Sequence, residues 1–335
     1  MTIKDIAKEC GCAIGTVSRV LNNHPDVSDK TREKVMAVVQ KHGFVLNANA
    51  KQLKAQERKN IVVIVKGSSS PLLNGLLEGL QKKLEPLPYT VDVVVLDEKD
   101  DEASNAVRIY YAQKPVGFVF LGGNPDKYNE EFDKVQVPCV LISNAADSVK
   151  SQFLSSVSTD NKEASYFVTR YLIENGHKKI GIIGGNIEDS VISKTRYEGF
   201  LKAMNEAKLE FDFEKSYQVS KYSMQGGFEA VEKLLSQNPN ITAIYAMSDV
   251  MAIGACRKLQ DINIKVPEQI SIIGFDGIEL ANFFCPRITT IRQLKDELVE
   301  QGLALLLASI ENNASATHKR VPFEFVIGES VKKIN

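Results

Sequence analysis

Long apolar runs, a secretory leader and a paired set of cysteines are all missing from this chain of 335 residues. No run approaches the roughly 18 apolar residues that a transmembrane helix needs. The start, MTIKDIAKEC, has no basic segment followed by an apolar one, so we expect no secretory signal and a cytoplasmic protein.

The five cysteines form an odd, scattered set, which favours reduced thiols over a disulfide framework. Cys10 and Cys12 are close enough in sequence to suggest a metal site. No second pair of Cys or His residues follows at zinc-finger spacing, so we expect no metal. The other three are Cys139, Cys256 and Cys285.

Signatures of catalysis are absent as well. The glycine pairs that begin at Gly122 and Gly184 do not stand in the GxGxxG or GxxxxGKS frames that bind nucleotides, and no GxSxG or HExxH occurs. None of the four histidines lies beside a plausible nucleophile. The sequence therefore argues against a sugar-modifying enzyme, and we expect no cofactor.

What is present is a soluble globular composition with an uneven charge. Apolar residues make up 44% and charged residues 25% of the chain, and the length predicts two or three domains. Residues 1–59 hold 11 Lys/Arg against 6 Asp/Glu, whereas the remainder holds 30 against 36. A basic head on an acidic body is typical of a chain whose head alone contacts a polyanion, although an excess this small is also compatible with chance.

The first 45 residues contain no strand-like run and predict three short helices. The first carries an apolar stripe and ends at Gly11. The second covers residues 14–22 after a tight turn, and the third begins after Ser28 and ends at Gly43. The segment that follows is polar and basic, and it has too little apolar surface to be a stable helix alone.

From residue 60 the pattern changes to alternating strands and helices. The run IVVIV predicts a strand buried on both faces, and the helical stretch LLNGLLEGLQKKL and the strand YTVDVVVL follow it. The alternation continues through GFVFL and PCVLIS, restarts near Lys162 and runs to the strand ISIIGFD. Two successive sets of this kind predict two doubly wound lobes with parallel sheets.

Two helices separated by only a few residues are typical of a helix-turn-helix, whose second helix lies in the DNA major groove. In the segment IGTVSRVLN the apolar Val17, Val20 and Leu21 can anchor the helix to the first one. The outer side is left with Ile14, Gly15, Thr16, Ser18 and Arg19. Because a guanidinium can bond guanine O6 and N7 together, Arg19 is the expected base reader. The short polar residues Thr16, Ser18 and Asn22 suit phosphates. The alternative is a helical hairpin with a solvated polar face.

Longer strings of the sequence resemble one family along the whole chain. The head contains IKDIAKECGCAIGTVSRVLNN, followed by VSDKTREKVMAVVQKHGF. The core contains STDN, RYLIENGHKKIGIIGG, RYEGF, SDVMAIGA, VPEQISIIGFDG and ITTIRQ in that order. These segments closely resemble the lactose/galactose-repressor (LacI/GalR) family of transcription regulators.

The resemblance implies which head residues read DNA. The family's two variable base-reading positions fall on Ile14 and Gly15, and its third falls on Arg19. Neither Ile14 nor Gly15 has a polar side chain, so most of the direct readout would rest on Arg19. Ala13 stands where the family has a capping serine, which removes a cap worth about 1 kcal/mol.

In the same family the linker folds into a hinge helix on DNA, and a leucine wedges into the minor groove. The matching residue is Leu53 within the AKQLK segment, with Ala50 and Lys51 as neighbouring hinge residues. Leu46 and Lys51 stand where the family often has proline and arginine.

Parallel sheets bind ligands beyond the carboxyl ends of their strands, so two facing lobes would share a cleft. The resemblance implies that Arg196 and Asp276 hold effector polar groups and that Asp160, Asp249 and Tyr222 make secondary contacts. Arg196 is expected at the start of a helix, where the helix dipole disfavours a cation, so we expect an anion or a ligand close to it. Asp249 has an alternative role as a helix N-cap, and Asp160 as a support of the crossover between lobes. The other expected cleft residues are Asn124, Ser70, Leu72 and Leu73.

The predicted fold is an all-α helix-turn-helix headpiece plus an α/β core of two doubly wound parallel-sheet lobes, like those of periplasmic binding proteins. We expect a DNA-binding domain at residues 1–45, a hinge at 46–59 and a core at 60–335. The N-lobe would comprise about 60–159 and 291–321, and the C-lobe about 160–290 and 322–335.

The predicted function is a transcription repressor whose affinity for double-stranded, pseudo-palindromic operator DNA is controlled by a small effector between the lobes. The effector is expected to be a sugar or sugar derivative, and a nucleobase or a protein corepressor is the alternative. We expect a homodimer, because helix-turn-helix proteins read pseudo-palindromes with two-fold partners. A secreted binding protein without DNA function is disfavoured by the missing signal and by residues 1–59.

Overall fold

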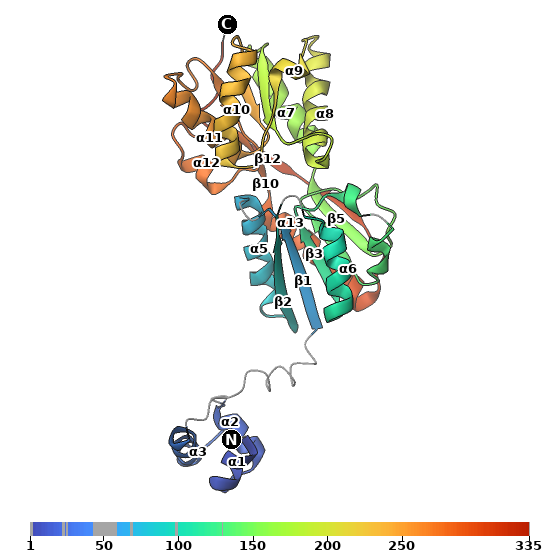
Figure 1. The fold of residues 1–335 in the computed structure, drawn as a ribbon, viewed down its shortest axis with the longest axis vertical. Coiled ribbons are helices and arrows are strands. Elements are labelled where there is room, and N and C mark those ends of the chain that lie inside the picture. Colours follow the sequence, from blue (N-terminus) through green and yellow to red (C-terminus); the bar gives the residue numbers. More distant parts are fainter. Residues whose placement is uncertain are drawn as a thin grey trace. The chain divides into compact units, whose positions relative to one another are not determined.

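The computed structural model describes residues 3–21, 24, 26–42, 59–67, 70–97, 100–128 and 130–334. The chain divides into two compact units, residues 1–58 and residues 59–335 (Figure 1). None of the helices in these ranges is both long enough and apolar enough to cross a membrane.

The head consists of α1 (Ile3–Glu9), α2 (Ile14–Leu21) and α3 (Asp29–Lys41). Gly11 has a φ of +60°, so it ends α1 in the left-handed conformation that glycine adopts most readily. Ser28 lies at the N-cap of α3, but its hydroxyl bonds the Thr31 hydroxyl at 2.9 Å rather than a backbone N–H. The expected ends at Asn22 and Gly43 lie outside the described residues.

The three head helices share one small apolar core. Its fully buried members come from all three helices and from the turn after α1, and each such side chain contributes about 1.5–3 kcal/mol through burial. Glu9 joins the end of α1 to the end of α3 through Lys41 and His42, each at 2.8 Å. The buried residues are Ile6, Ala7, Cys10, Val17, Val20, Val35 and Val39.

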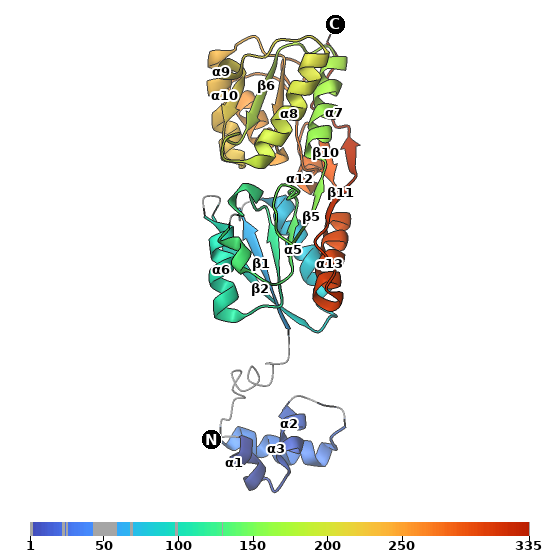
Figure 2. The ribbon, with the colours of Figure 1, turned by 90° about the vertical axis from the view of Figure 1, so that its right-hand side faces the viewer.

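The N-lobe is a parallel sheet between two layers of helices. α5 (Pro71–Leu84) and α13 (Lys295–Asn312) cover one face, and α6 (Glu102–Gln113) covers the other, as Figure 2 shows. Strand β1 pairs on both sides, with Val63 opposite Val93 and Val119, which explains its continuous apolar run. In the described part of the chain the sheet order is β11 (His318–Val321), β5 (Leu154–Thr159), β4 (Cys139–Ile142), β3 (Gly117–Leu121), β1 (Lys59–Lys66) and β2 (Tyr89–Leu96).

The C-lobe repeats this layered plan. Its parallel sheet has the order β7 (Tyr217–Val219), β6 (Ile180–Gly184), β8 (Ala243–Ala246) and β9 (Ser271–Ile273). One face is covered by α7 (Asn161–Glu174) and α8 (Val191–Glu206), and the other by α10 (Met224–Gln237) and α11 (Asp249–Asp261). The short helices α9 (Phe213–Ser216) and α12 (Glu279–Phe283) complete it.

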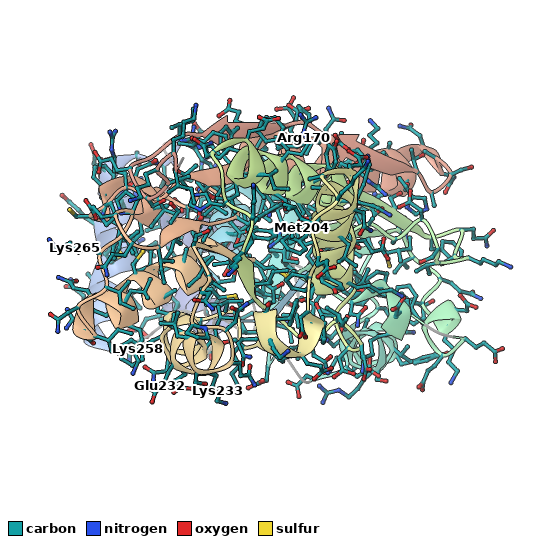
Figure 3. All side chains as sticks on the ribbon, turned by 90° about the horizontal axis from the view of Figure 1, so that it is seen from above. Arg170, Met204, Glu232, Lys233, Lys258 and Lys265 are labelled. Atoms are coloured by element: carbon teal, nitrogen blue, oxygen red, sulfur yellow. The ribbon has the colours of Figure 1, made fainter. Side chains whose placement is uncertain are left out.

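Helices α10 and α11 approach each other closely because glycines line their contact. A Cβ at Gly254 would overlap the carbonyl oxygen of Met224, and one at Gly227 would overlap that of Met251. At the rim, Lys258 bonds Glu232 at 2.7 Å across the same two helices. Figure 3 shows both charged residues at the edge of the C-lobe and Met204 in its interior.

The chain passes between the lobes three times within the described core. β5 leads through Asp160 into α7, β10 (Thr290–Gln293) leads through Leu294 into α13, and β11 leads through Pro322 into β12 (Phe323–Val326). β10 and β12 form an antiparallel pair, and β10 also bridges to Asp276 through Arg292. This pair carries side chains from the crossover directly to the ends of the C-lobe strands.

Candidate DNA-reading head and effector cleft

The structure places the expected base readers on the exposed face of α2. Ile14 is 47% exposed, Arg19 is exposed, and the space around Gly15 is open. The opposite face carries Val17 and Val20, which are buried against the other two helices. This arrangement leaves one side of the helix free for a groove.

The first turn of α2 forms although Ala13 offers no side-chain cap. The amide groups of Thr16 and Val17 donate to the carbonyl oxygen of Ala13 at 2.9 and 3.1 Å, so the helix starts from Ala13 without a side-chain cap. Thr16 and Ser18 are half-buried at the edges of the exposed face. Four predicted DNA contacts, Asn22, Ala50, Lys51 and Leu53, lie outside the described residues.

A cavity of about 790 Å³ lies between the two lobes of the core. The carboxyl ends of strands from both sheets line it, as expected for parallel sheets that face one another. Seven predicted effector residues line this cavity, namely Ser70, Leu72, Leu73, Asn124, Arg196, Tyr222 and Asp276.

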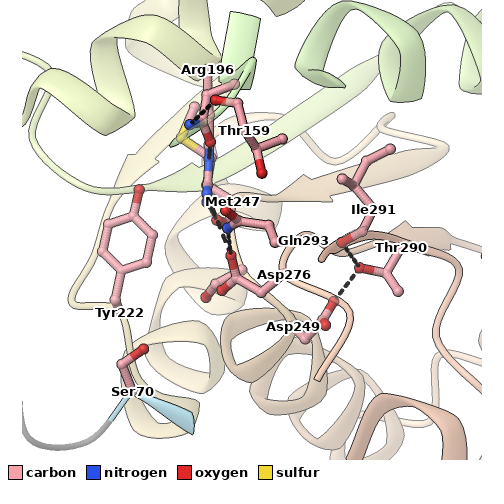
Figure 4. Close-up of polar contacts among 12 residues, drawn as sticks. Ser70, Thr159, Arg196, Tyr222, Met247, Asp249, Asp276, Thr290, Ile291 and Gln293 are labelled. Carbon is pink, nitrogen blue, oxygen red and sulfur yellow. Dashed lines mark hydrogen bonds and ion pairs between the residues drawn. The ribbon is translucent and has the colours of Figure 1, made fainter. Parts of the chain in front are cut away.

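Arg196 is the most strongly held cation of the cleft. Its side chain is buried, with Nε donating to Oδ1 of Asn161 at 3.0 Å, Nη1 donating to the carbonyl oxygen of Met247, and Nη2 lying 3.4 Å from Oδ1 of Asp276 (Figure 4). The guanidinium lies 3.6 Å from the ring centre of Phe275, a cation–π contact. The rotamer is therefore fixed before any ligand binds.

The position of Arg196 in its helix differs from the prediction. We expected it at a helix start, but α8 begins at Val191, so Arg196 lies in the second turn. The dipole argument for a nearby anion is therefore wrong. The buried carboxylate of Asp276 supplies the counter-charge instead.

Asp276 has a backbone that few side chains tolerate. Its φ is +108°, outside the regions that non-glycine residues ordinarily occupy, and its N–H donates to the carbonyl oxygen of Ile291 at 2.8 Å. Burial raises the pKa of its carboxyl, while Arg196 and Gln293 oppose that rise. Strain of this kind persists only where the surroundings impose it, and here it directs a carboxylate into the cleft.

Gln293 is a cleft residue that we did not predict. Its Nε2 donates to Oδ1 of Asp276 at 2.8 Å, while its Oε1 is buried and has no hydrogen-bond partner among the described residues. A buried acceptor without a partner is costly, so this oxygen calls for a donor from a ligand or water. Gln293 is the last residue of the ITTIRQ segment. Its position in that pattern is equally typical of an ordinary residue at the end of a strand, so the sequence did not mark it as a cleft residue.

Tyr222 is a further residue that lines the cavity. Its hydroxyl bonds the Ser193 hydroxyl at 2.9 Å, and burial raises the pKa of the phenol. A Cβ at Gly185 would lie only 2.6 Å from Oγ of Ser193 and 2.9 Å from the Tyr222 ring. Glycine at that position therefore leaves room for the Tyr222 ring and the Ser193 hydroxyl.

The N-lobe wall combines a helix start with an aliphatic surface. Ser70 caps α5 and accepts from the N–H of Leu73 at 3.4 Å, and Leu72 and Leu73 face the cavity. Asn124 donates through Nδ2 to the carbonyl oxygen of Asp189 at 2.9 Å, which joins the two lobes across the cleft.

Two predicted effector contacts do not line the cavity. Asp249 is fully buried behind it, and Ser248 is the N-cap residue of α11, so the alternative role of Asp249 as N-cap is wrong as well. Asp160 caps α7 by accepting from the N–H of Glu163 at 3.0 Å, directly at the first crossover. That position matches the supporting role considered for it.

Lys66 is a second cleft residue absent from the predictions. It ends β1 and pairs with the fully buried Glu102 at 2.6 Å. Lys127 and Lys221 also line the cavity. Among the described residues, no cluster of three or more His, Cys, Asp or Glu side chains could hold a metal ion.

The arrangement of these groups suits reversible binding. A few convergent polar groups on the C-lobe face an aliphatic wall on the N-lobe, across a cavity within the usual size range of small-molecule sites. The polar set offers an arginine donor, a carboxylate acceptor and an amide acceptor side by side.

Comparison with known families matches both units of the chain. Residues 2–47 match the family described as bacterial regulatory proteins, lacI family. Residues 58–328 match the family described as periplasmic binding proteins and sugar binding domain of LacI family. The second match alone covers most of the chain.

Individual proteins agree over their full length. The chain is 35% identical to the HTH-type transcriptional regulator MalR of Clostridium butyricum, over 98% of this chain and 99% of the relative. It is 31% identical to the HTH-type transcriptional repressor PurR of Pasteurella multocida, over 99% of this chain and 98% of the relative.

A solved structure of the lac repressor dimer bound to operator and the anti-inducer ONPF shares the fold, with a TM-score of 0.76, 23% identity and 99% of each chain covered. The predicted fold class is thus confirmed, and the two family matches identify a DNA-binding regulator with an effector-binding core rather than an enzyme. This chain belongs to the LacI family of bacterial regulatory proteins.

Proposed function

We propose that the protein is a repressor that leaves its operator, or binds it, according to the occupancy of the interlobe cleft by a carbohydrate. The observation that carries this proposal is the convergence of Arg196, Asp276 and Gln293 on one cavity, with Oε1 of Gln293 lacking a partner among the described residues. Adjacent hydroxyl groups both donate and accept, so they match this set of groups, whereas a purely apolar ligand would leave it unsatisfied.

The head would read DNA through the exposed face of α2. Arg19 bonds a guanine, Ile14 and Gly15 approach the bases closely, and Thr16, Ser18 and Asn22 contact phosphates. Residues 1–45 form the DNA-binding domain and residues 46–59 the hinge, in which Ala50, Lys51 and Leu53 enter the minor groove. Two copies would bind a pseudo-palindrome as a homodimer in the cytoplasm, where the DNA lies.

Switching would follow from the three crossovers. A ligand that binds one arrangement of the lobes better shifts the population towards that arrangement. The hydrogen bond between Asn124 and the carbonyl oxygen of Asp189 joins the two lobes, so a rotation of one lobe against the other would change it. In the homodimer, this rotation would change the distance between the hinge segments of the two copies.

The proposal is tested by selecting operator sequences from random duplexes and titrating them by fluorescence anisotropy, with and without a carbohydrate library. We expect a palindromic preference that falls steeply with salt, and a ligand that changes the apparent Kd at least tenfold. Asp276→Asn should leave DNA binding intact and abolish the ligand response. A response to nucleobases alone would instead favour the nucleobase alternative, and a response to a protein alone would favour a corepressor.

A further inference from the structure

The N-lobe wall of the cleft contains a buried ion pair. Nζ of Lys66 lies 2.6 Å from Oε2 of Glu102, and the side chains are 10% and 0% exposed. The other carboxylate oxygen accepts the backbone N–H of Asn124 at 2.5 Å. Lys66 lines the cavity, whereas Glu102 lies behind it.

This geometry fixes an ammonium group at the surface of the cavity. A lysine at a strand end ordinarily extends into water, because its long side chain is flexible. Here Glu102 and the packing around it hold the group in place. An ammonium has three N–H donors, and one of them reaches Glu102 in the described part of the chain, so donors remain for a ligand.

Burying such a pair costs free energy, and packing of the lobe alone does not explain why a charged pair lies here. Two apolar side chains of similar size would stabilise the lobe as well or better, since both charges must be removed from water. A buried pair at the wall of a binding cavity, of which only the lysine lines that cavity, is therefore best explained by what the lysine contacts there.

The charge of the cleft is opposite in sign to the charge of the core around it. The chain after residue 59 holds 30 Lys/Arg against 36 Asp/Glu. Of the Lys, Arg, Asp and Glu side chains that line the cavity, four are cationic and two are anionic. Low-dielectric walls focus such a field on the bound ligand. The six residues are Lys66, Lys127, Arg196 and Lys221 against Asp189 and Asp276.

We propose that Lys66, held by Glu102, is a specificity-determining residue, and that the effector is a carbohydrate with an anionic group directed at the N-lobe wall. This inference rests on the proposed function. Arg196, Asp276 and Gln293 take the hydroxyl groups at the C-lobe end, while Lys66 takes a phosphate or carboxylate oxygen at the other end. An anion is the group that gains most from a fixed ammonium, because charge-assisted hydrogen bonds are roughly twice as strong as neutral ones.

The test uses the full-length protein and matched ligands measured by calorimetry: glucose, glucose 6-phosphate and glucuronate, and maltose with its 6′-phosphate and its aldonate. We expect at least one anionic member to bind ten times more tightly than its neutral parent. The phosphate and carboxylate arms show which anion the site prefers. Inorganic phosphate alone at the same ionic strength controls for nonspecific attraction.

Lys66→Met keeps the length of the side chain and removes its charge. It should abolish the anionic preference and change affinity for the neutral parent less than threefold, whereas Lys66→Arg should retain the preference. Lys258→Met, which breaks the Lys258–Glu232 pair outside the cleft, should change neither affinity. Thermal unfolding of each variant verifies folding, and Lys66→Arg still decides the question if Lys66→Met does not fold.

Two results would overturn the inference in different ways. Equal affinity for neutral and anionic members, unchanged in Lys66→Met, refutes the role of Lys66 but leaves the carbohydrate proposal standing. If no carbohydrate binds at all, and Arg196→Ala therefore has nothing to abolish, the proposed function itself fails and this inference fails with it.

Discussion

Thr290 donates its hydroxyl hydrogen bond to Oδ1 of Asp249 at 2.6 Å, inside the C-lobe and behind the strand end that carries Asp276. The second carboxylate oxygen accepts the N–H of Ile278 at 2.8 Å, and the N–H of Asp249 donates to the carbonyl oxygen of Phe275 at 2.7 Å. Asp249 therefore fixes the backbone on both sides of Asp276. It acts on the cleft through its neighbour, although it does not line it.

The buried carboxyl of Asp249 predicts an unusual pH dependence. Burial, followed by the charge of Asp276, raises its pKa well above the ordinary value. The folded state then holds a proton that the unfolded state has lost, so the free energy of unfolding should fall as pH rises above about 4, by at most about 1.4 kcal/mol per pH unit. Asp249→Asn cannot ionise and should flatten this slope.

Urea unfolding monitored by circular dichroism between pH 4 and pH 8 measures both slopes. Asp212→Asn is a suitable control, because that carboxylate is solvated and Lys215 lowers its pKa, so its own effect on stability lies below about pH 4 and the variant should keep the slope of the original protein. An Asp249→Asn variant with the same pH slope as the original protein would contradict the prediction.

Arg196 should be required for effector binding and for the stability of the C-lobe. Arg196→Ala leaves the carboxylate of Asp276 without its cation, and breaking a buried pair in this way costs about 3–5 kcal/mol. We expect loss of measurable effector binding together with a lower midpoint of unfolding. The control is Arg170→Ala, whose guanidinium pairs with Glu174 on the exposed face of α7. Equal losses in the two variants would show that the contacts of Arg196 have no special role.

Arg19 should determine sequence preference without affecting the fold of the head. Its side chain is exposed on α2, so Arg19→Ala should leave thermal stability unchanged and relax discrimination at one base pair by about 1–3 kcal/mol. Arg19→Lys keeps the charge and loses the bidentate geometry. It should therefore retain the salt dependence of DNA binding and lose the discrimination. Anisotropy titrations on the selected operator and on single-base variants separate these outcomes.

Gly254 should not tolerate even one added methyl group. Its Cβ would overlap the carbonyl oxygen of Met224, so Gly254→Ala must push α10 and α11 apart, at a cost of about 1–3 kcal/mol or more. Gly75→Ala is the matched control, because its Cβ would meet only the far end of the Lys295 side chain. That substitution should be neutral or stabilising by the better helix propensity of alanine. Chemical unfolding of both variants compares them directly.

Periodic apolar segments were sufficient to predict most of the core up to β9. The predicted strands at YTVDVVVL and GFVFL coincide with β2 and β3, and the predicted helix LLNGLLEGLQKKL covers all of α5 except its first residue. Here burial on one or both faces dictates the residue types, so the local pattern carries the information.

The missed elements depend on partners far along the chain. β5 has the sequence LSSVST, and its polar residues hide a fully buried strand. Two of their hydroxyls bond residues far along the chain: Ser155 accepts from the N–H of Thr317 at 3.1 Å, and Ser156 bonds Nδ1 of His318 at 2.9 Å. No local sequence pattern could predict these bonds, because the partners lie 162 residues away.

The cleft residues also divide into those that the sequence predicted and those that it did not. Arg196, Asp276 and Tyr222 were found through a family resemblance, and they do line one cavity. Lys66 was not predicted, because its partner Glu102 is 36 residues away and no local pattern links the two. Which polar residue is buried is decided by the tertiary fold, so these positions required the structure.

The three crossovers also set the order in which a growing polypeptide can finish its lobes. The N-lobe begins first, yet its sheet needs β11 and its core needs Leu298, Leu306 and Val321, all made after the C-lobe strands β6 to β9. The C-lobe sheet already has β6 to β9 when residue 273 emerges. The C-lobe also waits for Phe323, Phe325 and Val331, which follow the third crossover. Neither lobe can therefore close on its own, and a nascent chain exposes the apolar face awaiting α13 until residues 295–312 have emerged.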